Sequence, residues 1–137
     1  MILVLDLVAY ALLFFFLWIT SFLVHELCHI IGAGTLHGTI TIDGLSMSAT
    51  PANLWAGGLG SGLIYAVAGA LVWLLGNHPF AWLFLTIAAV QGLYGTFEGI
   101  CLPTQNGVDT EEYWLGRWTI YLCVSTAMLI YGLVFIR

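Results

Sequence analysis

The sequence contains no lysine and only two arginines, Arg117 and Arg137, among its 137 residues. We therefore expect no nucleic-acid partner, because phosphate contacts require clustered Lys and Arg side chains. Charged residues make up 7% of the chain, whereas soluble domains carry about 25%. The three cysteines are an odd number without paired spacing, so they give no disulfide framework. These absences argue against a water-soluble domain.

Apolar residues take the place of the missing charges, and 61% of the chain is hydrophobic. A membrane-spanning helix needs about 20 apolar residues, so a chain of this length with short loops can cross a bilayer about four times. We predict an all-α membrane protein, with residues 1–137 forming a single transmembrane domain in the lipid bilayer. The expected four transmembrane helices cover about residues 3–34, 52–75, 80–102 and 113–136.

Residues 38–48 follow a different pattern, in which apolar and polar side chains alternate on both sides of Asp43-Gly44. Such alternation is typical of strands, and an Asp-Gly pair is a strong signal for a tight hairpin turn. We therefore expect a short β-hairpin over about residues 38–48, after the first helix.

The second expected helix is rich in glycine near its start. Gly58 and Gly62 lie four residues apart and form a small-xxx-small pair. Small residues at this spacing let helices approach closely in lipid. We expect this face of the helix to pack against a neighbouring helix.

The most informative segment is H-E-L-C-H, residues 25–29, which follows an uncharged run over residues 7–24. Residues four apart share one face of a helix, so His25 and His29 project side by side and can bind one Zn²⁺. Glu26 is placed to take a proton from a water activated by that metal. Because ionisable groups are costly to bury in lipid, we interpret this segment as a functional site for one zinc ion per chain.

A catalytic zinc usually takes three protein ligands, so one more is needed beyond the two histidines. If successive helices cross the membrane in alternate directions, the first and third helices end on the same side. Glu98 lies near the end of the third helix, and Asp109 lies in the polar loop beyond it. We predict Asp109 as the third ligand because it combines a loop position with the correct side. Glu98 is the alternative ligand, or it supports a ligating histidine.

Cleavage of a carbonyl compound also needs a donor to the oxygen that becomes negative. Three polar residues are expected on the same side as the histidines: Asn53, Ser61 and Asn106. The sequence does not choose among them.

Tryptophan favours membrane interfaces, and its distribution indicates the depth of the motif. Trp55, Trp114 and Trp118 are expected at the end that holds the histidines, whereas Trp73 and Trp82 are expected at the opposite end. The histidine pair should therefore lie close beneath one membrane face, where water can reach it.

Together these features resemble the site-2 protease family of intramembrane zinc metalloproteases. The resemblance covers most of the chain. It consists of H-E-L-C-H in a membrane helix, a β-rich stretch after it, a glycine-rich start of the next span, and the loop 102–110, in which Pro103 precedes Asp109.

The resemblance implies a zinc endopeptidase that cleaves membrane-embedded or juxtamembrane protein segments near the cytoplasmic face. Carried over to this sequence, the zinc ligands are His25, His29 and Asp109, and Glu26 is the base. Two positions depart from the family pattern: Asp109 is not followed by glycine, and Ser61 stands where the family has asparagine.

Two other interpretations remain open. An HtpX-like membrane protease shares the first motif but takes a helical glutamate as third ligand, which would be Glu98 here. A membrane scaffold or inactive homologue would bind zinc structurally or not at all. Metal content and hydrolysis distinguish these classes.

Overall fold

The protein was analysed as a computed structural model, which describes residues 2–32, 40–43, 46–49, 54–104 and 111–135. Four helices and two strands follow one another along these residues. Their bounds are α1 Ile2–Gly32, β1 Ile40–Asp43, β2 Ser46–Ala49, α2 Leu54–Leu74, α3 His78–Thr104 and α4 Glu111–Phe135. The four predicted helical ranges differ from these bounds only at their ends.

Three of the helices are long and apolar enough to cross a membrane, over Leu7–Ile31, Trp55–Leu74 and His78–Ile100. Among the described residues, α4 is not one of these candidate spans. The predicted fold of four transmembrane helices with a hairpin over 38–48 is therefore wrong as stated. The chain is compatible with an integral membrane protein that has three candidate spans.

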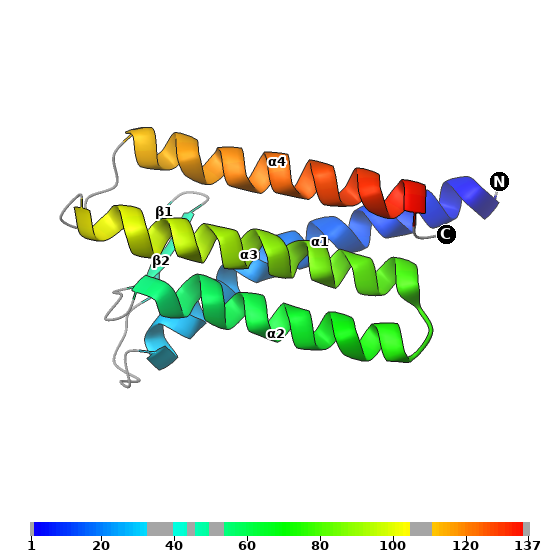
Figure 1. Ribbon diagram of the computed structural model, residues 1–137, viewed down its shortest axis with the longest axis horizontal. Helices are drawn as coiled ribbons and strands as arrows, with labels where there is room; N and C mark the ends of the chain where they lie inside the picture. Colours follow the sequence, from blue (N-terminus) through cyan, green and yellow to red (C-terminus); the bar gives the residue numbers. More distant parts are fainter. Residues whose placement is uncertain (1, 33–39, 44–45, 50–53, 105–110, 136–137) are drawn as a thin grey trace.

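The segment between α1 and α2 contains the two short strands. β1 and β2 pair antiparallel, with Ile40 opposite Ala49 and Asp43 opposite Ser46. The strands thus begin and end later than the range 38–48 expected from the alternating pattern. They lie at the end of the molecule where α1 finishes and α2 begins (Figure 1).

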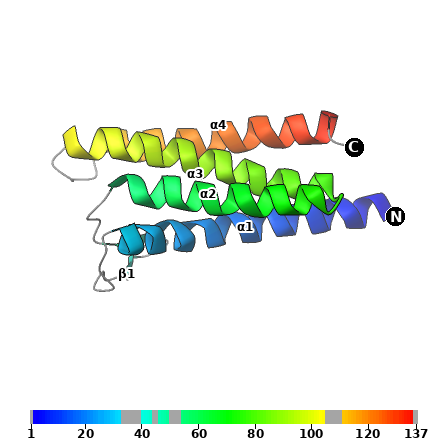
Figure 2. The same cartoon turned by 60° about the horizontal axis from the view of Figure 1, so that its bottom comes forward.

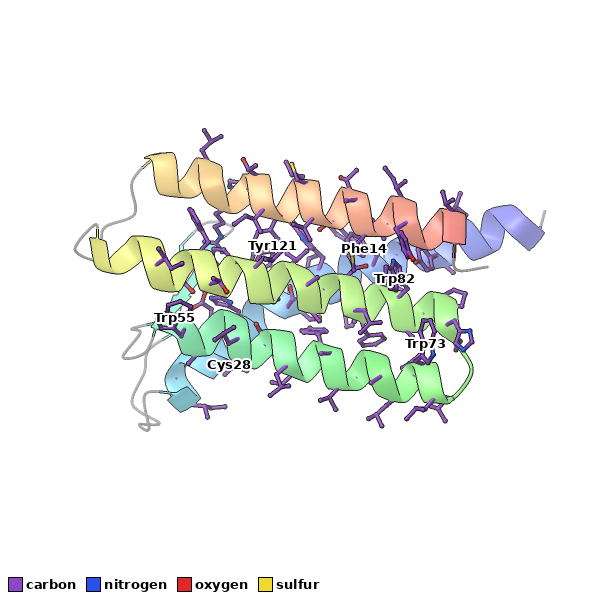
Figure 3. All side chains as sticks on the ribbon, in the orientation of Figure 1. Phe14, Cys28, Trp55, Trp73, Trp82 and Tyr121 are labelled. Carbon is purple, nitrogen blue, oxygen red and sulfur yellow. The ribbon has the colours of Figure 1, made fainter. Side chains whose placement is uncertain are left out.

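The helices run side by side along the long axis of the molecule (Figure 2). The end of α1, the start of α2 and the end of α3 lie at one end, whereas the turn between α2 and α3 lies at the other (Figure 1). Trp55 and Trp73 mark these opposite ends (Figure 3). Alternating helix directions therefore bring the end of α1 and the end of α3 together, as predicted from counting passes.

The closest packing is between α2 and α3, and glycine permits it. A Cβ on Gly95 would lie 2.8 Å from the carbonyl carbon of Gly58, so the two backbones touch at this crossing. One turn further along, a Cβ on Gly62 would lie 3.2 Å from the carbonyl oxygen of Ala88. The predicted packing role of Gly58 and Gly62 is confirmed, and it fixes α3 close to the start of α2.

The turn between α2 and α3 is built by local chemistry. Gly76 has φ +81°, a conformation that side-chain-bearing residues rarely adopt. Asn77 accepts a backbone hydrogen bond from Ala81 at 2.9 Å and so starts α3. The helix begins earlier than predicted, because Pro79 is tolerated in a first helical turn, where its missing N–H costs nothing.

The distribution of polarity suits lipid rather than water. Large apolar side chains such as Phe16, Leu63 and Leu71 point outward. The interior holds polar groups that are fully shielded, among them Ser21 and Gln91, each with 0% exposure. A helix bundle with an apolar exterior and a polar interior is what intramembrane functional sites require.

Candidate metal centre

Three side chains from two helices converge near one end of the bundle. His25 and His29 come from α1, and Glu98 comes from α3. The Nε2 atoms of the two histidines are 3.0 Å apart. The Oε2 atom of Glu98 lies 3.1 Å from His25 Nε2 and 3.3 Å from His29 Nε2. The three atoms therefore form a nearly equilateral triangle.

This triangle has the dimensions of a zinc ligand set. With bonds of about 2.0–2.1 Å and tetrahedral angles, ligand atoms around zinc are separated by about 3.3–3.4 Å. The separations in the protein, 3.0 to 3.3 Å, are only slightly shorter. A single proton can bridge two of the three atoms, whereas one cation can satisfy all of them. Two imidazoles and a carboxylate are also ligands that zinc accepts.

The surroundings hold the Glu98 carboxylate in place. Tyr94 lies one turn earlier on α3, and its hydroxyl donates to Glu98 Oε1 at 3.3 Å. The Tyr94 ring also packs against the ring of His25, with centroids 5.1 Å apart. Oε1 of Glu98 thus accepts a hydrogen bond from Tyr94, and Oε2 faces the two histidines.

The three side chains are also deeply buried. His25, His29 and Glu98 are between 1% and 7% exposed. Removing an ionised carboxylate from water costs several kcal/mol unless it is paired. The guanidinium of Arg117 lies 5.0 Å from the centre of the Tyr94 ring, which places a positive charge near this group.

The proposed base, Glu26, is also buried, at 6% exposure. It directly follows His25 on α1, so its side chain leaves the helix about 100° away from that histidine. The motif therefore carries two side chains that could hold a metal and one separate carboxylate within residues 25–29 of α1. This is the arrangement that metal-assisted hydrolysis uses.

The predicted site residues have different outcomes. The structure brings His25 and His29 together with Glu98, the residue that the sequence offered as the alternative ligand. The preferred third ligand, Asp109, lies outside the described residues, as do Asn53 and Asn106.

Ser61, the described member of the three oxyanion candidates, is fully buried. Its hydroxyl lies 3.2 Å from both the Gly58 carbonyl oxygen and Gln91 Oε1, either of which can accept its single hydrogen. The Ser61 hydroxyl is thus bound to acceptors within the protein.

Sequence reasoning missed Gln91 and Tyr94 as parts of this site. Gln91 Oε1 lies 3.0 Å from His25 Nδ1. A signal was present for Gln91, because an amide within an apolar membrane helix needs a polar partner. Tyr94 gave no comparable signal, since tyrosine is common in such helices and its role depends on which residues face it.

Gly57 on α2 lies against the centre and makes a testable contribution to it. A Cβ at this position would overlap the His29 ring, 2.6 Å from Cδ2. Gly57→Ala should displace Nε2 of His29 and weaken zinc binding by about tenfold or more, since metal bonds tolerate only about 0.2 Å of error. The measurement is the zinc Kd of the purified variant.

A matched control for Gly57→Ala is Gly92→Ala on α3, where a Cβ would meet nothing within 4 Å. Alanine favours a helix over glycine by about 0.8–1.0 kcal/mol, so helix propensity does not explain a loss in either variant. Equal zinc affinity in both variants would show that His29 does not bind the metal at the position described.

Comparison with known proteins gave no relatives: no protein-family model, curated protein or solved structure matches this chain. The resemblance to the site-2 protease family thus depends on the sequence motifs themselves.

Proposed function

We propose that this protein is an intramembrane zinc endopeptidase in which His25, His29 and Glu98 bind the metal. The observation that carries the proposal is the triangle of two imidazole nitrogens and one carboxylate oxygen, with sides of 3.0–3.3 Å. All three residues belong to helices that can cross a membrane. A buried group of this kind on apolar helices is costly, which supports a functional role.

The choice of Glu98 departs from the family resemblance, which implies Asp109. A glutamate from a helix as third ligand is the arrangement expected for an HtpX-like membrane protease. The choice is supported by the distances of Glu98 Oε2 to both histidines. Peptidase activity itself is inferred from the H-E-x-x-H motif and its position in a membrane helix.

Zinc bound here would lower the pKa of a water molecule towards neutrality and polarise a substrate carbonyl. The part of this chain is to orient the reactants and move protons. The Glu26 carboxylate accepts a proton from the attacking water and then donates it to the nitrogen of the departing amine. The buried surroundings keep bulk water away and strengthen every charge interaction in the site.

The expected substrate is a transmembrane or juxtamembrane segment of a protein. The test uses purified protein in lipid bilayers with a panel of labelled transmembrane peptides. We expect one zinc per chain, cleavage of at least one peptide, loss of cleavage after chelation, and recovery on adding zinc. Stoichiometric zinc without chelator-sensitive cleavage of any peptide would instead indicate a structural metal site, and absence of zinc would refute the metal centre.

A further inference from the structure

Gln91 is a fully buried amide on α3 whose oxygen contacts the ring of His25. We propose that Gln91 presets His25 as a metal ligand by fixing which ring nitrogen carries hydrogen. This inference rests on the proposed zinc site and adds a positioning residue to it. Gln91 does not touch the proposed metal, because it contacts the opposite nitrogen of the imidazole.

Gln91 lies on α3 about two helical turns before Glu98, so both residues face α1. It is fully buried, and its amide makes four contacts with side chains of three helices. Oε1 faces His25 Nδ1 at 3.0 Å and Ser61 Oγ at 3.2 Å. Nε2 faces Ser21 Oγ at 2.8 Å and the Tyr121 hydroxyl at 3.2 Å.

The Ser21 hydroxyl decides the orientation of the amide. Its single hydrogen is donated to the carbonyl oxygen of Trp18 at 2.6 Å. Ser21 Oγ can therefore only accept from Gln91, so the NH₂ group of Gln91 faces Ser21. The carbonyl oxygen of the Gln91 amide must then face His25.

An amide oxygen can only accept a hydrogen bond, so Nδ1 of His25 must donate and carry the hydrogen. In the neutral ring, the lone pair is then on Nε2. Nε2 is the atom that lies 3.1 Å from Glu98 Oε2 and 3.0 Å from His29 Nε2. The lone pair of His25 is thus directed to the place where the other two ligands meet.

A contact of this kind raises metal affinity in two ways. It prevents rotation of the ring, and it makes the ligating nitrogen more basic. Removing such a partner typically costs about 10–100-fold in metal affinity. Gln91 should therefore contribute to affinity although it supplies no ligand atom.

The first test compares zinc Kd values of the full-length protein and two Gln91 variants in the same detergent. Gln91→Met has a similar length but no acceptor, so we expect about 10–100-fold weaker binding. Gln91→Glu keeps an acceptor for Nδ1–H. It should therefore bind zinc more tightly than Gln91→Met and recover most of the zinc affinity that the Met variant loses. The control is Thr86→Val, which removes a different fully buried polar group from α3. The Thr86 hydroxyl donates to the Trp82 carbonyl oxygen and does not contact His25 in the hydrogen bonds described.

The second test reads the tautomer directly, in metal-free protein labelled with ¹⁵N-histidine. The signal of His25 is identified by its loss in His25→Asn. In the parent protein, Nδ1 should carry hydrogen, as in the tautomer that donates to Gln91 Oε1. In Gln91→Met, the preference for this tautomer should fall, which a merely structural role for Gln91 would not produce.

The outcomes separate this inference from the proposed function. If the parent binds zinc through His25, His29 and Glu98 but Gln91→Met binds equally well, the positioning role is refuted and the zinc site stands. Absence of hydrogen from Nδ1 of His25 in the parent refutes the role even if a variant fails to fold, because Gln91 Oε1 can only accept. If zinc does not bind but the tautomer is as expected, the orientation by Gln91 stands and the zinc enzyme fails.

Discussion

Replacing Glu98 with alanine is expected to abolish stoichiometric zinc binding, whereas Asp109→Ala should leave it intact. Glu98 supplies an oxygen 3.1 and 3.3 Å from the two histidine nitrogens, the separation expected of atoms that share one metal. Protein zinc sites gain about 10–16 kcal/mol from four ligands, so losing one ligand should weaken binding on the order of 100-fold to 1,000-fold. The measurement is zinc Kd by competition with a chromogenic chelator.

Glu98→Gln completes this experiment because it keeps the shape of the side chain and removes its charge. It should also weaken zinc binding strongly, since an amide oxygen is a poorer zinc ligand than a carboxylate. Thermal unfolding of each metal-free variant checks that the bundle still forms. The opposite pattern, with loss of zinc in Asp109→Ala and retention in Glu98→Ala, would restore the ligand set implied by the resemblance to site-2 proteases.

Local patterns in the sequence were sufficient for the helices and for two of the three residues of the centre. The spacing of His25 and His29 alone places both side chains on one face of α1. The apolar runs predict where helices form, and counting passes predicts that Glu98 approaches the histidines from α3. These inferences depend on periodicity and direction, which a single sequence contains.

The position of Glu98 next to both histidines could not be read from the sequence in the same way, because the distance depends on how the helices cross. Contact between the Gly58 and Gly95 backbones sets the separation of α2 and α3. Such a contact between two helices depends on tertiary packing, which the local pattern of the sequence does not contain. The structure shows that Glu98 of α3 brings a carboxylate to both histidines, whereas the prediction for Asp109 falls on residues outside the described ranges.

The hydrogen-bond network around Gln91 was beyond sequence reasoning for a related reason. Its partners, Ser21, Ser61 and Tyr121, belong to three different helices and are separated from it by at least 30 residues. Each alone resembles an ordinary small or aromatic packing residue. Only their joint position around one amide supports the proposal that Gln91 orients His25.

The substitution Glu26→Gln should retain zinc at one ion per chain and reduce peptide cleavage by about 10²–10⁴-fold or more, the usual contribution of a general acid–base. Glutamine has the same shape as glutamate but cannot accept a proton from water at neutral pH. Because the metal ligands are other residues, the expected signature is a fall in kcat with unchanged zinc Kd. Single-turnover cleavage of the best peptide from the panel provides the measurement.

Leu27→Ala is the matched control for Glu26→Gln, because Leu27 is the next residue on α1 and its side chain is 41% exposed on the outer face of the bundle. It should cleave at nearly the parental rate. If Glu26→Gln cleaves as fast as Leu27→Ala, another group takes the proton and Glu26 is not the base. If Glu26→Gln loses zinc together with activity, the buried carboxylate of Glu26 helps to bind the metal. The assignment of Glu26 as a residue distinct from the metal ligands is then wrong. Only retention of zinc with loss of cleavage assigns Glu26 to the chemical step, since the two His ligands and Glu98 would then still be in place around the ion.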